Sequence, residues 1–124
     1  MKKAVLIVTL LAGANLVWAG ASNHFETRVD LTRRVAYGSF TDTRASADTT
    51  QYIGCDLYLS GGTEARLGCL AKDTALEALS CSTTNPEIVK ISQAISDQSY
   101  IYFRCDASGE LDYLFVSNGS RWLD

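Results

Sequence analysis

The chain has 124 residues, of which 47% are hydrophobic and 20% are charged, with 11 Lys and Arg against 14 Asp and Glu. This length suits one small domain. The net charge is −3 and no run of basic residues occurs, which argues against binding of nucleic acid or of an anionic membrane surface. Neutralisation of phosphate groups supplies most of the affinity for nucleic acid, and clusters of basic side chains attract a protein to anionic lipids.

Residues 1–21 have the pattern of a secretory signal peptide. Two lysines precede an apolar run over 4–12, and small residues follow, so that cleavage is expected after Ala19 or Ala21. The run is shorter than the roughly 20 residues of a membrane span, and we expect no span in the mature form. Cleavage would leave 9 basic against 14 acidic residues, a net charge of −5, in one domain over 22–124. The protein is therefore expected to be periplasmic or secreted.

Alternating apolar residues predict strands in the first half of this domain. A short extended piece is possible around Val29 and Leu31, and the predicted strands cover 33–40, 51–60, 65–72 and 76–82, with a polar loop over 41–50. In the second of these strands, a single face carries Ile53, Cys55, Leu57 and Leu59. We expect that face to point to the core and Tyr52 and Tyr58 to point away from it.

Four cysteines follow the predicted signal peptide: Cys55, Cys69, Cys81 and Cys105. An even number in a small exported domain favours disulfides. A zinc site would need close cysteine pairs, which are absent from the sequence, and the only histidine, His24, lies at the start of the mature chain. We therefore expect cross-links and neither a metal nor another cofactor.

The cysteine pairing is partly constrained by the turns. Gly61 and Gly62 predict a hairpin that places Cys55 opposite Cys69, but a second tight connection at Ala75 would place Cys69 opposite Cys81. Three pairings remain possible. We favour Cys55–Cys69 with Cys81–Cys105, because each bond then joins neighbouring elements without competition.

The period of the apolar residues changes at position 85. Asn85 is a suitable helix N-cap, Pro86 suits the first turn, and isoleucines recur at helical spacing, which predicts a helix over 86–96.

A last hairpin follows, with strands over 99–105 and 111–117. Its expected register sets Arg104 opposite Asp112 on the outer face and turns Phe103, Tyr113 and Phe115 inward. A short terminal strand is possible over 121–123. The fold class is therefore α+β, mainly β: an antiparallel meander of five or six strands, with one helix before the last hairpin and two disulfides.

Two sets of residues are candidates for binding. One set consists of tyrosines expected to point outward: Tyr52, Tyr58, Tyr100 and Tyr102. We favour the interpretation that the apolar stripe of the helix packs over these tyrosines and covers them. The polar loop before the first cysteine supplies the other set, Arg44, Ser46 and Asp48, for which turn capping is the favoured role. We identify no catalytic residue, because no histidine is placed for a Ser-His-Asp arrangement and no phosphate-binding glycine loop occurs.

The run R-A-S-A-D-T-T-Q-Y-I-G-C over 44–55, with spaced cysteines and S-Y-I-Y-F over 99–103, resembles a family of small exported proteins of Gram-negative bacteria. In that family's pattern the last cysteine follows a D-x-x-G turn, where this chain has Leu111; here Cys105 stands across the same turn. The resemblance implies export and cross-linked cysteines, and it assigns no activity.

These features favour an exported binding module that contacts a protein or a glycan, as an inhibitor or an accessory protein of the cell envelope. The alternative is a structural or self-assembling component of the cell surface, since open sheet edges support strand addition. A hydrolase that uses carboxylates is a third possibility, drawing on Asp42, Asp48, Asp56 and Glu64.

Overall fold

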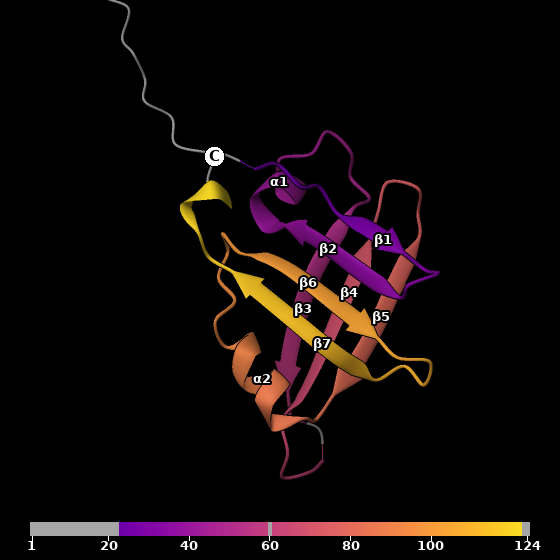
Figure 1. Cartoon of the computed structure of the whole chain (residues 1–124), viewed down its shortest axis with the longest axis vertical. Coiled ribbons are helices and arrows are strands. Elements are labelled where there is room, and N and C mark those ends of the chain that lie inside the picture. Colours follow the sequence, from indigo (N-terminus) through magenta and orange to yellow (C-terminus); the bar gives the residue numbers. More distant parts are fainter. Residues whose placement is uncertain (1–22, 60, 123–124) are drawn as a thin grey trace, which may run out of the picture.

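The computed structural model describes residues 23–59 and 61–122, so the predicted signal peptide over 1–21 lies outside the described residues. The described residues form two antiparallel sheets (Figure 1). Sheet A has the order β1-β2-β6-β7, with strands Arg28–Asp30, Val35–Ser39, Tyr100–Cys105 and Leu111–Ser117. Sheet B has the order β3-β4-β5, with strands Tyr52–Tyr58, Arg66–Lys72 and Ala78–Thr83. Two α-helices and a 3₁₀ helix complete the described fold, α1 (Phe40–Arg44), α2 (Pro86–Ser92) and η1 (Ser120–Trp122).

The prediction of a mainly β protein with antiparallel strands, a helix before the last hairpin and two disulfides is confirmed. The described residues form seven strands rather than the predicted five or six. These strands are divided between two sheets instead of one meander, because β2 pairs with β6 from the far end of the chain rather than with β3. The predicted polar loop over 41–50 begins with α1, whose first turn is capped by Ser39: its hydroxyl accepts a hydrogen bond from the Asp42 N–H. The prediction of a short terminal strand over 121–123 was wrong, since η1 occupies Ser120–Trp122.

Sheet B follows the register expected from its two turns. Cys55 lies opposite Cys69, and Cys69 lies opposite Cys81 on its other side. The bonds formed are Cys55–Cys69 and Cys81–Cys105, which confirms the favoured pairing. Gly61 adopts a φ of 65° in the β3–β4 turn, a conformation that glycine reaches without steric cost.

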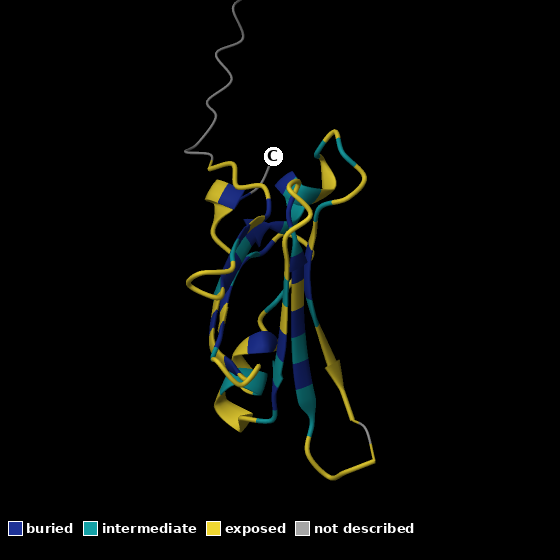
Figure 2. Cartoon of the chain, turned by 90° about the vertical axis from the view of Figure 1, so that its right-hand side faces the viewer, coloured by how far each residue is buried: buried dark blue, intermediate teal, exposed yellow. Residues whose placement is uncertain are grey.

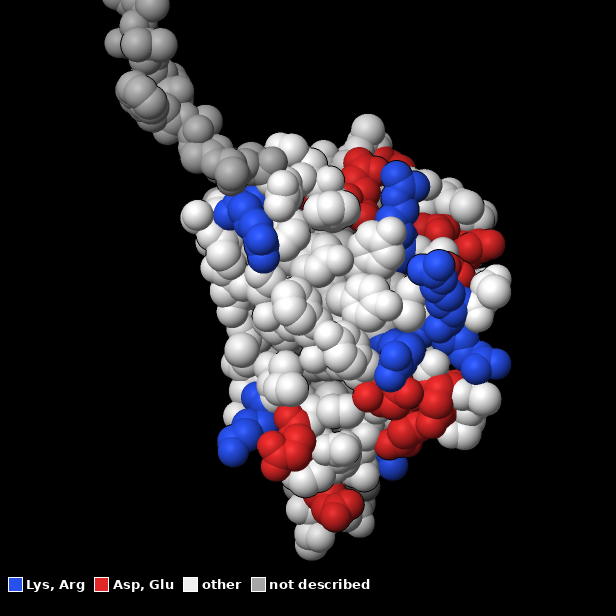
Figure 3. Space-filling model, in the orientation of Figure 1, with Lys and Arg blue, Asp and Glu red and all other residues white. Residues whose placement is uncertain are grey.

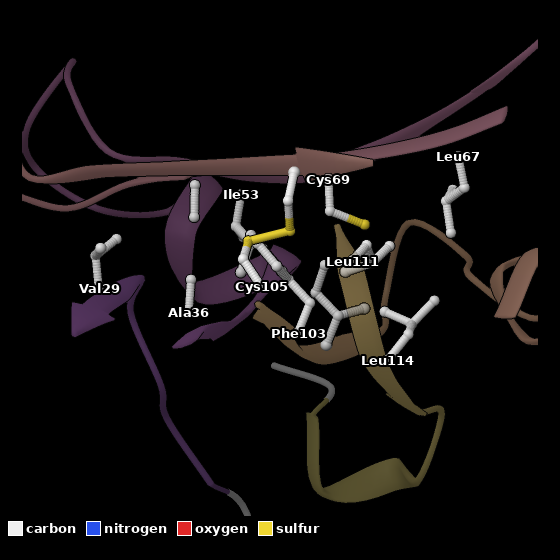
Figure 4. Close-up of a cluster of buried hydrophobic side chains, with 12 residues drawn as sticks. Val29, Ala36, Ile53, Leu67, Cys69, Phe103, Cys105, Leu111 and Leu114 are labelled. Atoms are coloured by element: carbon white, nitrogen blue, oxygen red, sulfur yellow. A yellow bond between two sulfur atoms is a disulfide. The ribbon is translucent and has the colours of Figure 1, made fainter. Parts of the chain in front are cut away.

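The core lies between the two sheets, which Figure 2 shows edge-on as two layers with buried stripes. Side chains that are almost fully buried include Phe103, Ile101, Leu67 and Leu111. The second disulfide joins β5 of sheet B to β6 of sheet A, and Figure 4 shows it among these side chains. It is therefore a covalent link between the two layers.

The register of the last hairpin differs from the prediction. A β-bulge between Arg104 and Cys105 shifts the pairing by one residue, so that Phe103 lies opposite Leu114 and Tyr102 opposite Phe115. Leu114 is consequently buried, while Tyr113 and Phe115 point outward and are 44% and 42% exposed. The expectation that Tyr113 and Phe115 face inward was wrong, because one extra residue in a strand reverses the facing of every side chain beyond it.

Helix α2 begins where expected and ends early. The Asn85 side chain accepts hydrogen bonds from the Glu87 and Ile88 N–H groups, and Pro86 opens the first turn. The regular helix stops at Ser92 rather than at residue 96.

Candidate functional site

The outer face of sheet A carries a row of long side chains across all four strands. Arg28 in β1 lies opposite Tyr37 in β2, Tyr37 opposite Tyr102 in β6, and Tyr102 opposite Phe115 in β7. Neighbouring residues on each strand, such as Ile101 and Phe103, point into the core. The alternation of a β-strand therefore sends the tyrosines to the outside.

The rings on this face are in continuous contact. The aromatic face consists of Phe25, Tyr37, Tyr100, Tyr102, Tyr113, Phe115 and Trp122. Tyr100 lies at its centre, stacked on Trp122 with ring centroids 4.4 Å apart and in edge contact with Phe25 and Phe115. Tyr102 contacts Tyr37 at 6.0 Å and Tyr113 at 5.7 Å. Ring pairs with such geometry typically contribute about 0.5–1.5 kcal/mol beyond area burial, so these contacts favour one arrangement of the rings.

The two ends of the domain complete this face. The Asn23 N–H donates to the Arg121 carbonyl at 2.8 Å, and the Thr41 hydroxyl donates to the Trp122 carbonyl at 2.8 Å. The Trp122 indole N–H is satisfied by the Ser117 hydroxyl at 2.7 Å. These bonds hold Phe25 and Trp122 against the sheet.

Charged side chains lie around the aromatic face. Figure 3 views sheet A from outside and shows an area without charged residues, bordered by basic side chains at the upper left and right. Arg121 lies over the Trp122 ring at 5.0 Å and Arg104 over the Tyr113 ring at 5.6 Å. Arg104 also bonds Asp112 at 2.9 Å, so the predicted outer pair forms despite the shifted register. An open hollow of about 390 Å³ is lined by Tyr100, Tyr102, Arg104, Tyr113 and Phe115.

The chemistry of Tyr100 is altered by its position. Burial, reinforced by the neighbouring Tyr37 and Tyr102, raises the pKa of Tyr100 to about 12. Its hydroxyl therefore ionises only at a more alkaline pH than that of an ordinary tyrosine.

The four predicted tyrosines do not form one patch. Tyr100 and Tyr102 belong to the aromatic face, whereas Tyr52 and Tyr58 lie on the outer face of sheet B and are 47% and 44% exposed. The Tyr52 ring lies over Gly54, so that a Cβ at position 54 would meet the Tyr52 hydroxyl at 2.7 Å and the ring would have to move. Helix α2 does not cover the tyrosines, which corrects the favoured expectation, because Ile88 and Val89 pack against the core cluster instead.

The polar loop has mainly structural roles. The Asp48 carboxylate accepts hydrogen bonds from the Thr50 and Gln51 N–H groups, and the Ser46 hydroxyl donates to the Thr43 carbonyl. Hydrogen bonds from the Gln51 side chain and from these N–H groups hold the pKa of Asp48 far below its ordinary value. Arg44 lies apart from Asp48 and, with Tyr52, borders a hollow of about 300 Å³ beside α1.

The four carboxylates considered for hydrolysis lie on separate elements. Asp42 belongs to α1, Asp48 to the loop before β3, Asp56 to β3, and Glu64 to the β3–β4 connection. Among residues 23–59 and 61–122 there is no cluster of three groups that could hold a metal ion. Within the same residues, no helix has the length and apolarity needed to cross a membrane.

Asp42 anchors the start of the domain. Its carboxylate bonds His24 Nδ1 at 2.9 Å and accepts from the Phe25 N–H and the Ser39 hydroxyl, both at 2.8 Å. Burial acts to raise its pKa, but the hydrogen bonds from His24, Phe25 and Ser39 outweigh burial and leave the pKa below the ordinary 3.8.

We expect Asp42→Asn to lower the free energy of unfolding at neutral pH by about 1–2 kcal/mol, because hydrogen bonds to a charged acceptor are lost. A carboxyl whose pKa is lowered by folding stabilises the fold above its unfolded pKa, and this contribution disappears as the pH falls through the folded pKa. The difference between wild type and variant should therefore shrink in acid, as measured by denaturant unfolding at neutral pH and near pH 3. Asp56→Asn, at an exposed carboxylate, is the control and should change stability by less than about 0.5 kcal/mol. A difference that persists unchanged in acid would contradict this role.

Five of the seven rings on the aromatic face were missed by sequence reasoning: Phe25, Tyr37, Tyr113, Phe115 and Trp122. Of these five rings, Tyr37 could have been predicted from the sequence, because it alternates with Ala36 and Gly38 in a predicted strand. Comparison of the chain with protein family models, curated proteins and solved structures finds no match. The candidate site therefore depends on geometry alone.

Proposed function

We propose that the chain is an exported binding module that contacts a protein partner through the aromatic face of sheet A. The observation that carries this proposal is the contiguous set of rings on the outside of a four-stranded sheet, where Phe25, Tyr113 and Phe115 stay 41–44% exposed. A large exposed apolar patch rimmed by polar residues is typical of an interaction site.

The composition of the face supports a protein partner. Tyrosine and arginine, which this face exposes at Tyr113 and Arg104, are among the residues most enriched at the energetic centres of protein interfaces, whereas Trp122 is buried beneath the face. The hollow over Tyr102 and Tyr113 is open rather than enclosed, whereas small-molecule sites bury most of their ligand. A broad contact with another protein fits this shape better than a small ligand does.

Export is part of the same proposal. Two disulfides among the described residues are typical of a protein that folds in an oxidising compartment outside the cytoplasm. The signal-peptide pattern supports delivery to the periplasm or to the outside of the cell.

The test is capture from an envelope extract by the immobilised chain, with Tyr113→Ala and Tyr58→Ala compared side by side. Both tyrosines are 44% exposed, but only Tyr113 lies on the aromatic face. We expect a protein that is retained by the wild type and by Tyr58→Ala and lost with Tyr113→Ala. Equal retention by the two variants, or retention of a purified envelope glycan in place of a protein, would contradict the proposal.

A further inference from the structure

The two sheets present four edge strands, and three of them are blocked against pairing with another chain. β1 has three residues, two of which, Arg28 and Asp30, are charged. β7 packs beside α2, where the Asn118 side chain donates to the Ala94 carbonyl at 2.9 Å. β5 carries polar Ser80 and Ser82, and Ser82 already forms a bridge with Glu110. Short strands, charges and coverage are the usual protection of sheet edges.

The fourth edge, β3, also contacts α1 and α2, but the last residues of this strand remain exposed and carry no charge after Asp56. Leu57, Tyr58 and Leu59 are three successive apolar residues that are 46%, 44% and 63% exposed. Residues 52–59 contain no proline and no lysine, and Asp56 is their only charged residue. Figure 2 shows the hairpin of β3 and β4 extending beyond the rest of the molecule, so this edge is accessible.

The free edge also offers unpaired backbone groups in a defined order. The Cα atoms of Cys55 and Cys69 are 4.0 Å apart, which marks an antiparallel pair that does not exchange backbone hydrogen bonds. The N–H and C=O groups of Cys55 and Leu57 consequently point away from β4, to the open side of the edge strand. A strand added at this edge would bond to these groups.

We propose that two copies of this chain pair antiparallel along the second half of β3, joining two copies of sheet B into one sheet of six strands. A second copy fits this edge because the segment is self-complementary: a twofold axis at Leu57 sets Leu57 against its own copy and Asp56 against Tyr58. No like charges then face each other, although the whole chain is acidic. An isologous contact of this kind closes on itself as a dimer.

The surface is distinct from the aromatic face, which lies on the other sheet, and pairing at β3 leaves that face exposed. The proposal therefore stands independently of the proposed function, and the dimer would present two aromatic faces.

The test compares Leu57→Lys with Leu70→Lys by sedimentation velocity, using the disulfide-bonded chain over a wide range of concentration. The two leucines are 46% and 45% exposed, but Leu70 lies in the central strand of sheet B and offers no edge. We expect a dimer for the wild type and for Leu70→Lys, with a dissociation constant at least about tenfold higher for Leu57→Lys, because edge lysines oppose strand pairing.

Backbone hydrogen exchange of the wild type provides a measurement that needs no variant. The Leu57 amide should become protected as concentration rises, since its N–H points away from β4 and pairing at this edge supplies it with an acceptor. A monomer at every concentration with a freely exchanging Leu57 amide would overturn the proposal. A dimer that is equally stable in Leu57→Lys would also overturn it.

Discussion

Replacing Tyr113 by alanine is expected to weaken binding of the captured partner by about 2 kcal/mol, a roughly 30-fold rise in the dissociation constant. Tyr113 contributes an exposed ring that is already ordered by an edge contact with Tyr102 at 5.7 Å and by the Arg104 guanidinium above it. Little conformational entropy remains to be lost on binding, so the buried area of the ring converts efficiently into affinity. Isothermal titration calorimetry with the purified partner measures the change.

The loss of affinity caused by Tyr113→Ala should exceed the loss caused by Tyr58→Ala, the matched substitution on sheet B. Tyr58→Ala removes a ring of the same type and the same 44% exposure from sheet B, and we expect affinity to change by less than about twofold. Each variant should keep both disulfides and a cooperative unfolding transition. If Tyr58→Ala weakens binding as much as Tyr113→Ala does, the partner contacts a surface other than the aromatic face.

The largest loss of stability is expected from removing the bond between the sheets. Cys81→Ala combined with Cys105→Ala should lower the free energy of unfolding by about 3.5 kcal/mol in the chain-entropy model, because the bond closes a loop between residues 24 apart. Both cysteines are buried, at 5% and 4% exposure, so the vacated sulfur volume adds to the loss. Denaturant unfolding in the absence of reductant measures the change. For a small domain this is a large share of the total stability.

The other disulfide provides the control. Cys55→Ala with Cys69→Ala opens a loop between residues 14 apart, for which the same model gives about 3 kcal/mol. We expect a smaller measured loss, because the β3–β4 turn and ladder still hold these strands together and Cys55 is only half-buried. A loss at this pair that equals or exceeds the loss at Cys81–Cys105 would show that the link between the layers is not the dominant constraint.

Local patterns were sufficient for sheet B and for the start of α2. The turn at Gly61 and the tight connection at Ala75 set both registers of the β3-β4-β5 meander, which place Cys69 between Cys55 and Cys81. The choice of Cys55 as the partner of Cys69 rested on leaving Cys81 free for Cys105. Asn85 and Pro86 located the beginning of the helix. In each case the contacts that decide the structure lie within a few residues of one another in the chain, so their geometry can be derived from residue type and spacing.

The candidate site could be predicted only in part. Tyr100 and Tyr102 were correctly expected to point outward, but they were grouped with Tyr52 and Tyr58, which lie on the other sheet. A single bulge after Arg104 decided that Tyr113 and Phe115 join the outer face. In residues 111–117 the odd-numbered and the even-numbered positions both contain apolar side chains, so alternation alone could not distinguish the two registers.

The sequence by itself determined the antiparallel, disulfide-bonded character of the protein and the strand registers within sheet B. Only the tertiary structure decided that the strands form two layers, that α2 leaves the tyrosines uncovered, and that Phe25 and Trp122 meet on one face. The physical reason is the range of the contacts involved. Pairing of β2 with β6 and contact between the two ends of the domain depend on the packing of the whole core, which no short stretch of the chain encodes.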